Sequence, residues 1–97
     1  MKPLTFLAAA AAEVEEAHRW YEPQRKGLGE EFLAAVETAL VSISNHPEAA
    51  PIVHRDVRRL LLKRFPYGIH YRLVEGSAVV VACFHAKPHP RAWKARR

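Results

Sequence analysis

The chain of 97 residues is long enough for one domain with a single core and too short for two, so we expect one domain over residues 1–97. Hydrophobic residues make up 49% of it and glycine occurs only 4 times, which excludes an intrinsically disordered protein. Residues 1–54 contain four Lys or Arg and eight Glu, whereas residues 55–97 contain eleven Lys or Arg and two carboxylates. The basic second half predicts a polyanion or an acidic protein as partner.

The single cysteine and the N-terminal segment indicate the compartment. Cys83 cannot form an internal disulfide and lies in an apolar run, so we expect a small buried residue in a reducing cytoplasm. Lys2 and the apolar residues 4–12 have the outline of a secretory signal peptide, but one lysine is a weak basic region and the alanines continue into Glu13 with helical character. No run reaches the roughly 20 apolar residues of a membrane-spanning helix, so no membrane contact is expected.

The first half of the chain predicts a short strand followed by a helix. Residues 3–7 are apolar and indicate a brief strand. Residues 8–22 have apolar side chains at helical spacing, at Ala10, Val14, Ala17 and Tyr21, and glutamates lie between them. Pro23 ends this helix, and residues 24–29 turn the chain through two glycines.

A second amphipathic helix follows and ends at residues 45–47. Its apolar stripe consists of Phe32, Leu33, Val36, Ala39, Leu40 and Ile43. The short link between the helices predicts a helical hairpin, and each stripe must be buried against another element. The apolar surface that remains for this is a sheet.

The second half of the chain predicts that sheet. Residues 48–56 are expected to be a proline-bearing connection, and residues 57–65 alternate as a strand. Residues 65–68, with Pro second and Gly fourth, match a type I turn. A strand at 67–74 with one apolar and one polar face, a turn at 75–77 and a strand at 78–85 complete a three-stranded antiparallel meander. The predicted fold is α+β, with both helices on one face of the sheet.

Several segments together resemble the RelE/ParE superfamily of toxins from type II toxin–antitoxin systems. They are WYE at 20–22, QRKGLGEEF at 24–32, NHPE at 45–48, VRRL at 57–60, FPY at 65–67, YR at 71–72, and FH at 84–85 through Pro90 to Trp93. The order and spacing are most similar to the ParE-like branch, often described as plasmid stabilisation proteins. Five consecutive alanines at the start of the first helix depart from the usual pattern.

The resemblance implies the same α+β fold and a cognate antitoxin whose flexible segment wraps the toxin. An acidic amphipathic segment would suit the basic half of the chain. The ParE-like branch inhibits DNA gyrase by binding, and this is our leading expectation. A RelE-like endoribonuclease that cleaves mRNA on the ribosome and a repurposed member without toxicity are the alternatives. A homodimer and a toxin–antitoxin hetero-oligomer both stay open, and no cofactor is expected.

The endoribonuclease alternative needs a proton-transfer group and cations around one phosphate. Its candidate catalytic residues are His85, Arg72, Arg64 and Lys87. A half-exposed strand histidine without chemistry is the competing interpretation of His85. Cys83, His85 and His89 lack a second pair at ligand spacing, so no metal site is expected.

Contacts with the target or the antitoxin are expected from cations and rings in the second half of the chain. The candidates are Arg58, Arg59, Lys63, His70, Trp93, Lys94, Arg96 and Arg97. The strand cations could instead protect a sheet edge against aggregation, and Trp93 could anchor the tail by packing. Trp20 and Tyr21 are expected between helix and sheet or in an antitoxin groove.

Overall fold

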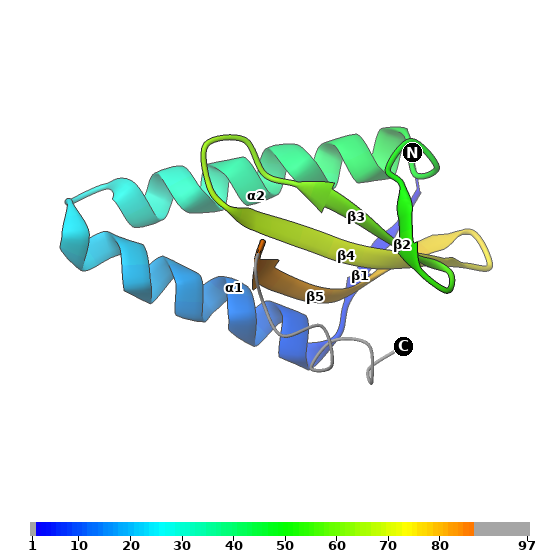
Figure 1. The fold of residues 1–97 in the computed structure, drawn as a ribbon, viewed down its shortest axis with the longest axis horizontal. Helices are drawn as coiled ribbons and strands as arrows, with labels where there is room; N and C mark the ends of the chain where they lie inside the picture. Colours follow the sequence, from blue (N-terminus) through cyan, green and yellow to red (C-terminus); the bar gives the residue numbers. More distant parts are fainter. Residues whose placement is uncertain (1, 87–97) are drawn as a thin grey trace.

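The computed structural model describes residues 2–86, and Figure 1 shows their arrangement. Within this range the elements are β1 (Leu4–Phe6), α1 (Ala8–Tyr21), a 3-10 turn (Glu22–Gln24), α2 (Leu28–Asn45), β2 (Ile52–His54), β3 (Val57–Leu61), β4 (Tyr67–Val74) and β5 (Ser77–His85). The strands form one sheet in the order β1-β5-β4-β3-β2, with β1 parallel to β5 and the other neighbours antiparallel. The predicted α+β fold is confirmed.

The meander has one strand more than the sequence predicts. β2 lies inside residues 48–56, where Ile52 is opposite Arg58 of β3. A tight turn joins the two strands, and Arg55 adopts a left-handed φ of 52° in it. Three residues that directly follow a proline are too few to show an alternating pattern, so the sequence alone favours a loop here.

The β3–β4 hairpin turns three residues earlier than predicted. Its loop spans residues 62–66, where the Leu62 N–H donates to the Tyr67 carbonyl (2.9 Å) and the Tyr67 N–H donates to the Phe65 carbonyl (2.8 Å). Pro66 is therefore the centre of a three-residue turn, which suits its fixed φ. Gly68 lies in β4 and is paired with β3. The prediction of a type I turn at residues 65–68 is wrong.

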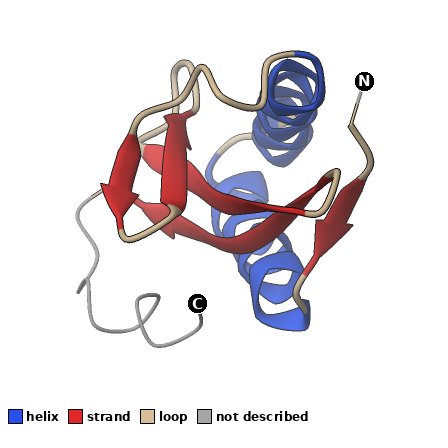
Figure 2. Ribbon diagram, turned by 90° about the vertical axis from the view of Figure 1, so that its right-hand side faces the viewer, coloured by secondary structure: helices blue, strands red, loops and turns tan. Residues whose placement is uncertain are grey.

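Both helices cover the same face of the sheet, as Figure 2 shows. The predicted stripes of both helices face this core, whose largest fully buried side chains include Phe32, Ile43, Ile69 and Tyr71. The Tyr71 hydroxyl donates to the Pro47 carbonyl (2.7 Å), which ties the end of α2 to the sheet. A smaller apolar cluster around Val57 lies on the opposite face.

One edge of β5 is covered by two different elements. β1 pairs with residues 78–80 of β5 and ends there. Farther along β5, a carboxylate oxygen of Glu13 in α1 accepts the Cys83 N–H (3.0 Å). The expected burial of Cys83 is confirmed, and burial, followed by the nearby Glu13 charge, raises the pKa of its thiol to about 12. α1 thus takes over the edge of β5 where β1 ends.

Candidate protein-binding surfaces

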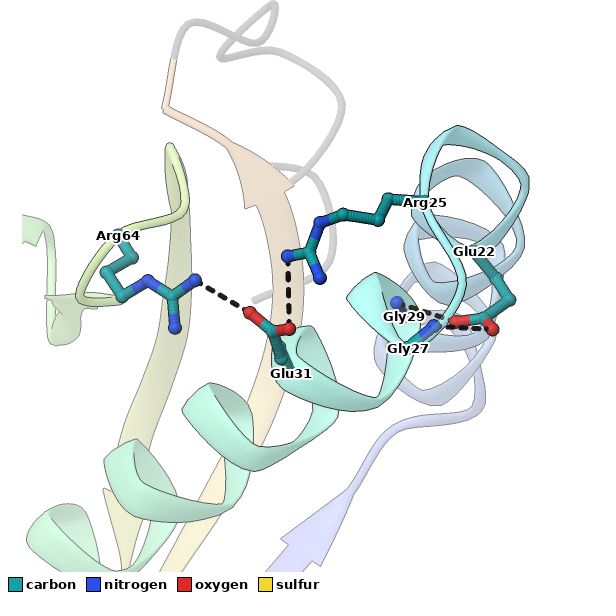
Figure 3. Close-up of polar contacts among 6 residues, drawn as sticks. All are labelled: Glu22, Arg25, Gly27, Gly29, Glu31 and Arg64. Atoms are coloured by element: carbon teal, nitrogen blue, oxygen red, sulfur yellow. Dashed lines mark hydrogen bonds and ion pairs between the residues drawn. The ribbon is translucent and has the colours of Figure 1, made fainter.

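The tip of the helical hairpin is held by one carboxylate. The two oxygens of Glu22 accept the N–H groups of Gly27 (2.9 Å) and Gly29 (2.8 Å), as Figure 3 shows. Gly27 precedes α2 with a φ of 90° and has no side chain to cap the helix, so Glu22 satisfies donors at the helix start. The bond from Gly27, and next that from Gly29, lower the pKa of Glu22. The hairpin link therefore has a fixed geometry.

A second carboxylate joins the hairpin tip to the sheet. Glu31 in the first turn of α2 pairs with Arg64 of the β3–β4 loop (2.7 Å) and with Arg25 of the hairpin link (3.0 Å), as drawn in Figure 3. Arg64, and next Arg25, lower the pKa of Glu31 through these hydrogen bonds. Arg64 has a left-handed φ of 70° and lies 5.6 Å from the centre of the Phe65 ring. Arg64 thus acts as a structural tie between α2 and the sheet.

The structure places His85 and Arg72 on opposite faces of the sheet. His85 is opposite Tyr67, which packs against the helix-facing core, and the two rings lie 5.5 Å apart. Arg72 is opposite Val79, which packs against the other apolar cluster. Its Nε and Nη2 donate to one oxygen of Asp56 (3.2 and 3.1 Å). His85 is also distant from Arg72 along the sheet, because its partner Tyr67 precedes Arg72 by five residues, about 17 Å along a strand.

The predicted contact cations of β3 are divided between the two faces of the sheet. Arg58 is opposite Tyr71 on the helix-facing side, and its Nη1 donates to the carbonyls of Glu48 (2.9 Å) and Ala50 (2.8 Å). Arg59 lies on the other face, opposite His70. The side chain of Arg58 is therefore used to hold the loop after α2.

His70 is buried, although the sequence suggests a partner contact. Its side chain lies on the same face as Arg72, as expected, but only 3% of the residue is exposed and its ring lies 5.7 Å from that of Phe84. Burial, followed by the nearby charge of Arg59, lowers the pKa of His70 to about 4. His70 is therefore a neutral packing residue at pH 7.

A groove of about 390 Å³ lies between α2 and β3. Small side chains of α2 and apolar side chains of β3 and its loop line it, and among them are Ala35, Thr38, Leu60 and Phe65. The charged residues of its lining are Glu31, Lys63 and Arg64; Arg64 is paired with Glu31, and Lys63 is exposed without an ion pair among residues 2–86. This groove combines small and apolar side chains with one lysine that has no internal ion pair.

A second groove, of about 640 Å³, lies between α1 and β5. Glu13, Glu16 and Trp20 of α1 line one side, and Tyr67 and His85 line the sheet side. Trp20 is 66% exposed, the highest value among the large hydrophobic residues of the described chain. In contrast to the first groove, this one is rich in aromatic rings and carboxylates.

Comparison with known proteins identifies the family. The family described as ParE toxin of type II toxin-antitoxin system, parDE, matches residues 4–89. The chain belongs to the ParE toxin family. A solved structure described as the chromosomal ParDE TA system from P. aeruginosa aligns with 88% of this chain and 96% of that chain, at a TM-score of 0.64 and 20% sequence identity, which shows the same fold. No curated protein matches the sequence.

The net charge of this ParE-family toxin comes from its last eleven residues. Residues 2–86 contain ten Lys or Arg and ten Asp or Glu, whereas residues 87–97 contain five Lys or Arg and no carboxylate. The predicted site residues outside the described part of the chain are Lys87, Trp93, Lys94, Arg96 and Arg97. The formal net charge of residues 2–86 is therefore zero, with His counted as neutral.

The described part of this ParE-family toxin has neither a cluster of metal ligands nor a membrane-spanning helix. No three His, Cys, Asp or Glu side chains of residues 2–86 are grouped as metal ligands would be. Neither α1 nor α2 has the length and hydropathy for crossing a bilayer. Glu16 is the surface residue that sequence reasoning missed, because helical spacing cannot show that a groove opens beside it. Trp20 was expected between helix and sheet or in an antitoxin groove, and the structure shows it 66% exposed in the lining of the α1–β5 groove, not between helix and sheet.

Proposed function

We propose that this ParE-family toxin inhibits DNA gyrase by binding to it and that a cognate antitoxin neutralises it. Family membership supplies the toxin class, and the choice of binding over catalysis depends on the positions of His85 and Arg72. Cleavage of RNA requires a proton donor or acceptor and cations around one phosphate. Opposite faces of the sheet separate these two residues, and the ion pairs with Glu31 and Asp56 hold Arg64 and Arg72.

The test compares two assays on the purified chain. Gyrase supercoiling is measured with increasing toxin, and a translated mRNA is examined for cleavage in parallel. We expect inhibited supercoiling and intact mRNA, and the Arg72→Ala variant should inhibit as the wild-type chain does. Charge removal at Lys94, Arg96 and Arg97 should weaken inhibition more. Cleaved mRNA with unaffected supercoiling, and loss of cleavage in Arg72→Ala, would establish the endoribonuclease alternative.

The groove between α2 and β3 is the proposed contact of the antitoxin. Its small and apolar side chains leave room for the apolar face of an amphipathic segment. Lys63 lines this groove and forms no ion pair with any residue of the described chain. Its ammonium group can therefore pair with a carboxylate of that segment. An acidic amphipathic antitoxin segment fits both features.

A charge reversal tests this contact. The protein encoded beside the toxin is co-purified, and its affinity is measured by calorimetry for wild type, Lys63→Glu and Lys26→Glu. Lys63→Glu should weaken binding about tenfold or more, since it puts like charges face to face. Lys26→Glu alters an exposed lysine of the hairpin link and should have a smaller effect. Equal affinities for all three chains would place the antitoxin elsewhere.

A further inference from the structure

The α1–β5 groove has the composition of a site for a positively charged side chain. Trp20 presents an exposed indole at its border, and Tyr67 and His85 supply further rings. Aromatic faces attract cations because of their quadrupole, and tryptophan does so most strongly. Glu13 and Glu16 add carboxylates to the same groove.

The two carboxylates have different roles in the groove. Glu13 is fixed by its hydrogen bond with the Cys83 N–H (3.0 Å). Glu16 is exposed and forms no ion pair among residues 2–86. It lines the groove together with Trp20 and Tyr67. A ligand cation between Trp20 and Tyr67 would therefore face an available carboxylate.

A cation that already lines the groove does not fill this position. Arg19 belongs to the lining, but its guanidinium lies 3.5 Å from the Glu15 carboxylate, one turn earlier on the outer surface of α1. Glu16 is left to an outside ligand. In the α2–β3 groove, Arg64 is paired with Glu31 and Lys63 is the charge without an ion pair among residues 2–86, so the two grooves suit segments of opposite charge.

We propose that the α1–β5 groove binds an arginine or lysine side chain presented on an apolar segment of the protein that the toxin inhibits. The rings contact the side-chain stem and the cation, and Glu16 pairs with the charge. The exposed Trp20 is the expected centre of the contact, because tryptophan is strongly enriched among residues that dominate binding energy at protein interfaces. This inference depends on the proposed function, in which the toxin acts by binding a target protein.

The first experiment uses Trp20 as the reporter. The chain has two tryptophans, so the Trp93→Phe variant leaves Trp20 as the only one. The probes are acetyl-Leu-Arg-Leu-amide and the same peptide with citrulline, which keeps the shape of arginine without its charge. We expect the arginine peptide to change Trp20 fluorescence with a dissociation constant about tenfold lower than that of the citrulline peptide. Glu16→Gln should remove most of this difference, whereas Glu37→Gln, which alters an exposed carboxylate of α2, should retain it.

Each other outcome of the titration contradicts the proposal. Equal binding of the two peptides would mean an apolar contact without charge recognition. No fluorescence change at millimolar peptide would mean that the groove has no such ligand. Binding that requires replacement of the five Lys and Arg of residues 87–97 by Gln would assign the groove to the chain's own C-terminal segment.

The second experiment separates this inference from the proposed function. The toxin concentration that half-inhibits gyrase supercoiling is measured for Trp20→Ala, Glu16→Gln and the control Val41→Ala, which removes an exposed apolar side chain of α2. Trp20→Ala and Glu16→Gln should raise this concentration about tenfold and about threefold, with Val41→Ala unchanged. Full inhibition by all variants overturns the groove contact and retains gyrase as the target. No inhibition by the wild-type chain overturns the proposed function, whatever the peptide titration shows.

Discussion

The tip of the helical hairpin and the α1–β5 groove contain the same kinds of side chain and use them differently. At the tip, Glu22 and Glu31 have their partners within the chain, and Phe32 is fully buried among other rings. Along the groove, Glu16 has no ion pair in the described chain and Trp20 is exposed. Charges and rings with internal partners hold the fold, and those without them are available for recognition. Substitutions in the two regions should therefore affect different measurements.

The largest effect should come from the buried ring at the tip. Phe32 lies 5.2–5.4 Å from the ring centres of Tyr21, Phe65 and Tyr67. Phe32→Ala should lower the free energy of unfolding by about 3–5 kcal/mol, because it removes buried apolar surface and leaves a cavity. Urea denaturation followed by circular dichroism measures this change. A loss below about 1 kcal/mol would mean that the tip collapses around the smaller residue.

A smaller loss is expected from Gly29→Ala. A Cβ at Gly29 would lie 2.8 Å from side-chain atoms of both His18 and Glu22, so these side chains would have to shift. Overpacking of this kind costs about 1–3 kcal/mol, measured by the same urea denaturation. The cost should be smaller when His18→Ala is already present. An equal cost in both backgrounds would show that His18 is not the obstacle.

Acid should weaken the tip through its two carboxylates. The pKa values of Glu22 and Glu31 in the folded chain lie below their ordinary value of 4.5, so the unfolded chain binds more protons as the pH falls. Their stabilisation is complete above that value and is lost as the pH falls through the lowered pKa. The urea midpoint should therefore fall less steeply between about pH 6 and pH 3 in the Glu22→Gln, Glu31→Gln double variant. An unchanged slope would contradict the role of these carboxylates.

The smallest effect on stability is expected in the groove. Trp20→Ala removes a side chain that is 66% exposed, so the free energy of unfolding should change by no more than about 0.5 kcal/mol. Thermal unfolding of the variant checks this. A clearly larger loss would show that Trp20 is part of the core and would remove the contrast between the two regions.

The spacing of apolar residues predicted the helices and strands that are long enough to bury one face over several turns or several residues. The stripes from Ala10 to Tyr21 and from Phe32 to Ile43 face the core, and the apolar run around Cys83 is the well-covered strand β5. β2 was missed because its three residues gain their structure from pairing with β3, which a local pattern cannot show. The β3–β4 turn was misplaced because Gly68, expected in the turn, is paired with Leu61 of β3, and Pro66 lies in a tighter turn closed by the bond from the Tyr67 N–H to the Phe65 carbonyl.

The candidate site was less predictable than the fold. Charge counting found the cations, but their partners are distant in sequence, as in the pair of Arg64 with Glu31 and the bonds from Arg58 to the loop after α2. Burial of His70 likewise depends on packing that is set by the whole sheet. The exposure of Trp20 next to Glu16 follows from the point at which α1 passes the edge of β5.

The parallel pairing of β1 with β5 also determines when the sheet can form during translation. Leu4 is placed opposite Ala78, so β1 leaves the exit tunnel well before β5 and must wait for it before the two can pair. Contacts between such distant positions form late, because a long loop must be closed first. A nascent chain that stops after β4 lacks β5, the strand that joins β1 to the rest of the sheet. Prematurely terminated products should therefore be unable to assemble the surfaces of the mature toxin.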